Sequence, residues 1–139
     1  MFSATEILIK LILSLIVGAV IGLERQKRKL GSAGLRTYML ICLGSVLITI
    51  VSTQGFSIDP ARIAAGIITA TGFLGAGTII ASRGEVRGIT TAASIWVVSA
   101  VGIAIALGFY FIAFITTILV LIILELWKLE IKLGLKRYQ

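Results

Sequence analysis

Long runs of apolar residues, separated by short polar and charged segments, dominate this sequence. A helix that crosses a membrane needs about 20 mostly apolar residues, and five segments approach that length. The first segment contains one charge, Lys10, whose long stem can carry its ammonium to the interface, beside Glu6 one turn earlier. The pattern predicts five transmembrane helices, at about residues 7–23, 37–56, 63–82, 90–107 and 109–127.

The division between the last two helices rests on length. No charged residue occurs from Ile89 to Leu124, and one helix of that length would be about 54 Å long, against a hydrocarbon core of about 30 Å. Gly108 is the strong helix breaker near the middle, and Phe109 and Tyr110 beside it suit a membrane interface. We therefore expect a tight turn at Gly108.

Composition supports the same class of protein. The 139 residues are 58% hydrophobic and only 14% charged, with a mean hydropathy of +1.10, whereas soluble domains carry roughly 25% charged residues. We expect an all-α integral membrane protein in which residues 1–127 form one compact five-helix bundle and residues 128–139 form a short interfacial tail. The single cysteine, Cys42, lies in an apolar run and excludes an intramolecular disulfide.

The net charge of +7 is distributed in a way that indicates orientation rather than nucleic-acid binding. With five spans, one side of the membrane receives only Lys10 and Arg62. The other side receives Arg25, Lys27, Arg28, Lys29, Arg36, Arg83, Arg87, Lys128, Lys132, Lys136 and Arg137. Because basic loops stay in the cytoplasm, the N-terminus is predicted to be outside, and both charged connections and the C-terminus to be cytoplasmic.

Residue types needed for most catalysis are missing from the sequence. There is no histidine, the one cysteine is in an apolar run, and no serine is placed with a base, so nucleophilic and soft-metal sites are not expected. The glycines of residues 72–77 are not followed by the lysine of a phosphate-binding loop. We expect neither an enzyme, nor a bound cofactor, nor a dedicated metal site.

Small residues recur at helical spacing and indicate close helix packing. Gly18 and Gly22 are four residues apart in the first predicted helix, and Gly72, Gly75 and Gly77 crowd the end of the third. Packing inside one bundle is the interpretation we favour, and a face between two copies of the chain is the alternative.

Polar residues beside the two cytoplasmic connections form the main candidate cluster. They are either a functional group at a pathway mouth or partner surface, or an ordinary basic flank with incidental acids and helix caps. The candidates are Glu24, Arg36, Arg83, Glu85, Arg87, Thr90 and Thr91. An unpaired charge at low-dielectric depth is costly, so we expect Glu24 to pair with one of these arginines.

Asp59 and Pro60 precede the third predicted helix on the external side. Aspartate suits the N-cap and proline the first helical position, so a structural cap is expected. Asp59 is also the best external candidate for contact with a cation.

Several motifs in a fixed order resemble the MgtC/SapB family of bacterial membrane proteins over nearly the whole chain. They are residues 22–25 (GLER), 33–37 (AGLRT), 59–62 (DPAR), 72–77 (GFLGAG) and 88–96 (GITTAASIW). The resemblance implies a multi-pass protein of the bacterial inner membrane, with relatives linked to growth at low magnesium, survival inside macrophages and restraint of the F-type ATP synthase.

The chain departs from the family pattern in two ways. Tyr38 stands where relatives often have histidine, and the C-terminal soluble domain of longer members has no counterpart in this sequence, which predicts a short form. Roles that depend on that domain are therefore not expected here.

Two functions remain open at this point. One is a regulatory or partner-binding membrane protein linked to magnesium limitation or membrane energetics, with Mg²⁺ as a signal and the F-type ATP synthase as a partner by resemblance. The other is a small transporter or channel, for magnesium or another ion, built by homo-oligomerisation. Magnesium prefers oxygen ligands, and the available carboxylates, Glu24, Asp59, Glu85 and Glu125, all lie near helix ends.

Overall fold

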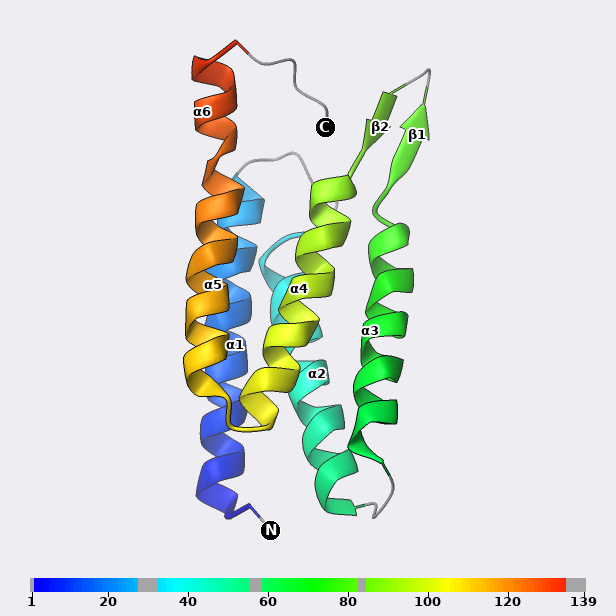
Figure 1. Ribbon diagram of the computed structural model, residues 1–139, viewed down its shortest axis with the longest axis vertical. Coiled ribbons are helices and arrows are strands. Elements are labelled where there is room, and N and C mark those ends of the chain that lie inside the picture. Colours follow the sequence, from blue (N-terminus) through cyan, green and yellow to red (C-terminus); the bar gives the residue numbers. More distant parts are fainter. Residues whose placement is uncertain (1, 28–32, 56–58, 83–84, 135–139) are drawn as a thin grey trace.

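A bundle of five long helices forms the body of the protein (Figure 1). The structure is a computed structural model that describes residues 2–27, 33–55, 59–82 and 85–134. Its elements are α1 (Ala4–Lys27), α2 (Leu35–Gly55), α3 (Pro60–Ala76), β1 (Ile80–Ser82), β2 (Glu85–Arg87), α4 (Ile89–Ala106), α5 (Tyr110–Glu125) and α6 (Trp127–Lys132).

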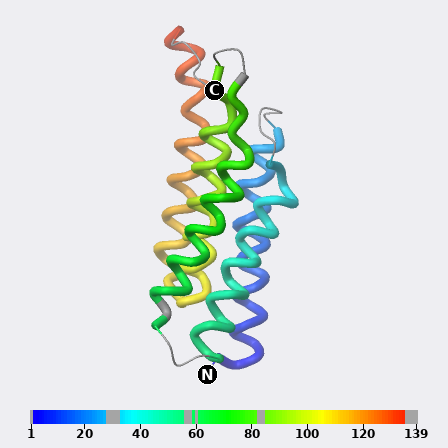
Figure 2. Tube along the Cα trace, turned by 90° about the vertical axis from the view of Figure 1, so that its right-hand side faces the viewer, coloured from blue at the N-terminus to red at the C-terminus, as the bar shows by residue number. Residues whose placement is uncertain are grey.

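The long helices run alternately up and down in two layers. Figure 2 shows α1 and α2 on one side and α3, α4 and α5 on the other. Helix α4 is central, since it contacts α1, α2, α3 and α5. The C-terminal end of α1, the β-hairpin and α6 lie at the same end of the bundle (Figure 1). We call it the basic end, and its described basic residues are Arg25, Lys27, Arg36, Arg87, Lys128 and Lys132.

The predicted membrane class agrees with this architecture. Three helices, α1, α2 and α4, and the segment Tyr110–Lys132 are each long and apolar enough to cross a membrane. The apolar helix Ala61–Ala76 is shorter, at about 24 Å. The chain is therefore mostly helical, with four candidate spans and one shorter apolar helix over the described residues.

The predicted extent of the third helix, residues 63–82, is wrong at its C-terminal end. Helix α3 ends at Ala76, and Ile80–Ser82 pairs as an antiparallel strand with Glu85–Arg87. Small residues at the helix end and β-branched isoleucines after it favour this change from helix to strand. Gly88 then closes the hairpin against Thr78, with φ of +93° and so little room that a Cβ would lie 2.1 Å from the Thr78 carbonyl oxygen.

The predicted turn at Gly108 is confirmed. Gly108 has a φ of +85°, its N–H donates to the Ile105 carbonyl at 3.1 Å, and the Phe109 N–H donates to the Ala104 carbonyl at 2.9 Å. These two bonds are the paired hydrogen bonds of a Schellman motif, which satisfies the last carbonyls of α4. Beyond the turn, α5 ends at Glu125 rather than at the predicted residue 127, and α6 continues the chain at the basic end.

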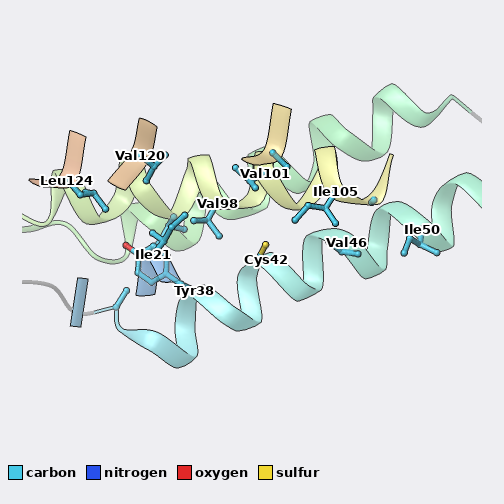
Figure 3. Close-up of a cluster of buried hydrophobic side chains, with 14 residues drawn as sticks. Ile21, Tyr38, Cys42, Val46, Ile50, Val98, Val101, Ile105, Val120 and Leu124 are labelled. Carbon is cyan, nitrogen blue, oxygen red and sulfur yellow. The ribbon is translucent and has the colours of Figure 1, made fainter. Parts of the chain in front are cut away.

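Polar hydroxyl groups lie inside the bundle, whereas large apolar side chains face outward. Ser14, Ser45, Thr49 and Ser99 are at most 5% exposed, while Phe111 is 77% exposed. Buried hydroxyl groups donate hydrogen bonds to backbone carbonyls of their own helix. The Thr49 hydroxyl, for example, donates to the Ser45 carbonyl oxygen at 2.7 Å. The apolar part of the interior includes Ile21, Tyr38, Cys42, Val46, Val98 and Val101 (Figure 3). This distribution fits a lipid solvent, in which exposed apolar side chains carry no penalty.

Two of the glycines predicted to pack are contact points between α1 and α2. A Cβ built at Gly18 would lie 2.7 Å from the Cα of Met39, and one at Gly22 would lie 2.8 Å from the Cα of Leu35. Backbones can approach this closely only where a side chain is absent. Gly102 has the same role between α4 and α2, with the Ser45 Cβ 2.8 Å from its built Cβ.

The glycines near the end of α3 differ from one another. A Cβ at Gly75 would lie 3.1 Å from the Ala92 carbonyl oxygen of α4, so Gly75 lies at the α3–α4 contact. A Cβ at Gly72 would meet no described atom within 4 Å, and one at Gly77 would meet only carbonyl oxygens of its own helix end. Within the described residues, Gly72 and Gly77 are therefore not contact points between helices of this chain, and a face between two copies stays a prediction for them.

The close approach at Gly18 predicts a large difference between two glycine-to-alanine substitutions. Gly18→Ala is expected to lower the free energy of unfolding by about 1–3 kcal/mol, because the methyl group meets the α2 backbone. Gly44→Ala, in α2 with nothing within 4 Å of the new Cβ, is expected to be neutral or to stabilise by up to about 1 kcal/mol. Thermal unfolding in detergent measures both, and equal effects would contradict the assigned contact.

Candidate functional site at the basic end

A buried arginine is the centre of the polar structure at the basic end. Arg25, in the last turn of α1, is only 6% exposed, and its Nη2 donates to Thr91 Oγ1 of α4 at 2.5 Å. The guanidinium therefore lies against the first turn of α4. Sequence analysis counted Arg25 only as an orienting charge, and its place in the GLER motif was the available signal for a larger role.

Hydroxyl groups from α2 and α4 extend the cluster inward. The Tyr38 hydroxyl, on a fully buried side chain, lies 2.5 Å from Ser94 Oγ. Ser94 Oγ also lies within hydrogen-bonding distance of the Thr91 carbonyl oxygen, at 2.9 Å. Three helices thus meet through Arg25, Thr91, Ser94 and Tyr38, which we call the Arg25 cluster. The tyrosine that departs from the family pattern is one of its members (Figure 3).

The predicted cluster is only partly assembled. Thr91 is buried and joins the Arg25 cluster, whereas its neighbour Thr90 is exposed. Glu24 is half-buried in the last turns of α1, and Arg36 is exposed in the first turn of α2. Arg83 lies outside the described residues.

The two hairpin candidates pair with each other. Arg87 Nη2 donates to Glu85 Oε2 at 2.9 Å, and both side chains are about 70% exposed. Of the three arginines considered as partners of Glu24, Arg87 thus pairs with the carboxylate of its own hairpin. An exposed pair of this kind stabilises little, at about 0–1 kcal/mol.

Asp59 lies at the opposite end of the bundle and has the predicted cap geometry. Its Oδ1 accepts a hydrogen bond from the Ala61 N–H at 2.9 Å, with Pro60 in the first turn of α3. The side chain is exposed, so its use as a cap leaves the second oxygen facing outward. Contact with an external cation stays a prediction.

Lys10 differs from the expectation that it would extend to the interface beside Glu6. It is 2% exposed, its Nζ donates to the Ala106 carbonyl at the end of α4 at 2.7 Å, and it lies 3.1 Å from the centre of the Phe2 ring. Glu6 instead accepts from the Ser3 N–H, and Ser3 Oγ accepts from the Glu6 N–H, as in a capping box. The partially negative C-terminus of α4 and the nearby Glu6 carboxylate both interact favourably with the Lys10 ammonium.

The described residues contain no group of three or more His, Cys, Asp or Glu side chains that could hold a metal ion. The basic end has six described basic residues against four carboxylates, so it offers an excess of cationic groups and hydrogen-bond donors. Such an arrangement suits anions, whether acidic side chains or phosphoryl groups.

The Arg25–Thr91 bond predicts a contrast between adjacent threonines. Thr91→Val removes the acceptor of a buried guanidinium N–H, and we expect it to lower the free energy of unfolding by about 1–3 kcal/mol. Thr90→Val, at the exposed neighbour, is expected to change it by about 0.5 kcal/mol or less. Thermal unfolding of both variants in the same detergent checks this, and a Thr91→Val variant as stable as Thr90→Val would refute the assigned bond.

Comparison with known proteins places the chain in a family. Residues 11–130 match the model of the MgtC family. The chain is 43% identical to an Escherichia coli K12 protein named "Putative magnesium transporter YhiD", with 96% of this chain and 66% of that protein covered. It is 37% identical to protein SapB of Bacillus subtilis, over 96% of this chain and 62% of SapB. It is 39% identical to protein MgtC of Salmonella typhimurium, over 82% of this chain and 49% of MgtC.

No solved structure matches the chain. The chain spans about half to two thirds of the length of these relatives. The matched residues cover α2 to α5, most of α1 and the motifs at the basic end. This chain belongs to the MgtC family of bacterial membrane proteins.

Proposed function

We propose that this protein is a regulatory membrane protein that acts by binding another membrane protein, in connection with magnesium limitation or membrane energetics. The bacterial inner membrane is its expected location, and the F-type ATP synthase is the partner that family resemblance suggests. Partner binding by this chain would use a surface that projects from the bundle and presents both charge and apolar area.

The β-hairpin is the observation that carries the proposal. It extends beyond the ends of α3 and α4 (Figure 1), and Ile80 and Val86 are 61% and 46% exposed beside the Glu85–Arg87 pair. Exposed apolar side chains next to charges on a projecting element are typical of protein contact surfaces. A two-stranded hairpin also has unpaired edges that a partner strand can extend.

The interior of the bundle supports regulation over transport. A magnesium path needs oxygen ligands along it, usually carboxylates and waters. In the described residues, Glu6 and Asp59 cap helices at one end, and Glu24, Glu85, Glu125 and Glu130 lie at or near the basic end. Between these ends, α2 and α4 approach closely at Gly102.

Transport is the second candidate, and one observation favours it. The E. coli relative carries the name of a magnesium transporter, although this chain covers only 66% of it. A pathway in this family could lie between copies of the chain, with Asp59 at one mouth and Glu24 at the other. Liposome flux distinguishes this candidate from partner binding.

Five membrane crossings follow from the connectivity if α2 and α4 both span the bilayer. Both helices begin at the basic end and end at the opposite one (Figure 1), so the chain has to return between them. Helix α3 makes that return despite its short length, because local thinning of the bilayer and flanking polar residues accommodate short spans. The basic end then faces the cytoplasm, in line with the distribution of Lys and Arg.

This topology predicts one-sided labelling of single cysteines in a Cys42→Ser background. Phe109→Cys, exposed at the α4–α5 turn, should react with a membrane-impermeant maleimide added outside intact cells, while Lys27→Cys should react only after permeabilisation. Both positions are exposed, so access across the membrane is the variable measured. Labelling of both from the same side would contradict five crossings.

Partner binding predicts a discrete photo-cross-link from the hairpin. A benzoylphenylalanine at Val86 is expected to give a protein adduct in native membranes, identified by mass spectrometry as a membrane protein such as an ATP synthase subunit. The same probe at Phe114, 62% exposed on the outer face of α5, is the matched control and is expected to give no discrete protein adduct.

Liposomes that contain purified protein and a magnesium-sensitive dye test the second candidate. We expect no uptake above that of empty liposomes. Strong uptake that disappears in Asp59→Ala or Glu24→Ala, together with no adduct from Val86, would replace the regulatory proposal by transport.

A further inference from the structure

A groove lies along α5 and α6 at the basic end of the bundle. Its volume is about 580 Å³, which is within the size range of pockets that hold small molecules. The described side chains that line it all come from residues 121–132, and they are four leucines or isoleucines and three charged residues. The groove therefore offers a ligand both an apolar wall and charged groups.

The lining of the groove changes from apolar to charged along the helix axis. Leu121 and Ile122 form the end that lies within α5. Lys132 forms the other end, about 15 Å beyond Ile122 at a rise of about 1.5 Å per residue. Between the two ends, Lys128 Nζ and Glu125 Oε2 pair at 2.5 Å. Lys132 has no carboxylate partner among the described residues, so the charged end of the groove carries an unpaired ammonium.

The groove spans the depth at which this part of the chain leaves the hydrocarbon core. The segment Tyr110–Lys132 is long and apolar enough to cross a membrane. Its 23 residues form about 35 Å of helix, against a core of about 30 Å, so its basic end reaches the headgroups. Ile122 is 54% exposed and lies at acyl-chain depth, whereas lysines at the end of a span direct their ammonium groups to the headgroup phosphates. The apolar end is therefore open to lipid chains and closed to water-soluble molecules.

We propose that this groove binds an anionic phospholipid. One acyl chain lies along Leu121, Ile122 and Leu126, and the headgroup phosphate accepts hydrogen bonds from the Lys132 ammonium. The charge of the lipid follows from Lys132, because an anionic headgroup neutralises this unpaired ammonium, whereas a zwitterionic headgroup brings a cation of its own beside it. The acyl chain follows from the depth of the apolar end, which a soluble phosphate or an acidic peptide does not enter. This site does not depend on the proposed partner binding.

Titrations of the full chain, purified in a neutral detergent, test the identity of the ligand. Dioleoyl phosphatidylglycerol, dioleoyl phosphatidylcholine and glycerol phosphate are each added at matched ionic strength, and the thermal midpoint of unfolding is recorded. Binding to the folded state raises this midpoint in a saturable way. We expect a saturable rise with phosphatidylglycerol and a much weaker one with phosphatidylcholine, which has the same chains. Glycerol phosphate, which has the headgroup charge without the chains, is expected to give no rise.

Two substitutions at exposed positions test the two ends of the groove separately. Lys132→Gln removes the headgroup contact, and we expect half-saturation to need about fivefold more phosphatidylglycerol, the factor typical of one lysine at an anionic membrane surface. Ile122→Trp fills the apolar end and is expected to weaken the phosphatidylglycerol response by excluding the chain. Arg36→Gln and Ile48→Trp make the same kinds of change at exposed positions of α2. They are the matched controls and should respond as wild type does.

Four outcomes would overturn the lipid site. The first is the lack of a saturable shift with phosphatidylglycerol, or an equal shift with phosphatidylcholine or glycerol phosphate. The second is an equal loss of response in Arg36→Gln and Lys132→Gln, because general positive charge would then explain the binding. The third is an unchanged response in Ile122→Trp. The fourth is a wild-type dimer that becomes a monomer in Ile122→Trp, measured by light scattering after size-exclusion chromatography, because a second copy of the chain would then occupy the groove.

Discussion

Close approach of helix backbones is the constraint on which this bundle depends. In a bilayer, burying apolar side chains between helices gains little, because lipid tails are equally apolar, so association relies on packing and on internal hydrogen bonds. Gly18 and Gly22 allow α1 to lie directly on α2, and Gly102 allows α4 to do the same from the other layer. Helix α2 is thus held by glycine contacts to α1 in its own layer and to the central helix α4 in the other.

The same solvent explains the unusual distribution of charge. Two cations are buried, and they contact the two ends of one helix. Lys10 meets the carbonyl end of α4, where the field of the helix favours it, while Arg25 meets the amino end, where the field opposes it. The first arrangement stabilises the fold. At the second position, the contact that holds the buried guanidinium is its hydrogen bond to Thr91.

Much of the architecture could be predicted from the sequence, because hydrophobic run length decides where membrane helices form. The turn at Gly108 followed from length and one glycine, and the Asp59 cap followed from residue type. The end of α3 could not be predicted in this way, because apolar residues such as Ile79 and Ile80 are compatible with either a helix or a strand. Pairing with residues 85–87 makes this segment a strand.

The candidate site was harder to predict than the fold. Thr90 and Thr91 are adjacent residues of the same type, so the sequence does not distinguish them. The orientation of α4 about its own axis in the bundle buries Thr91 and exposes Thr90. Lys10 and Arg25 were assigned to the interface because charged residues near helix ends usually extend to water. Their burial depends on which helix lies opposite, and that information is tertiary. The glycines show the same limit, since spacing identified Gly18 and Gly22 but could not separate Gly75 from Gly72.

The bond from Lys10 to Ala106 also constrains the order of events during synthesis of the chain. The two residues are 96 positions apart, so α1 leaves the ribosome and meets the membrane well before its acceptor exists. The bond can form only after α4 has been made and lies beside α1, so the burial of the first helix's charge in the finished bundle depends on the fourth helix.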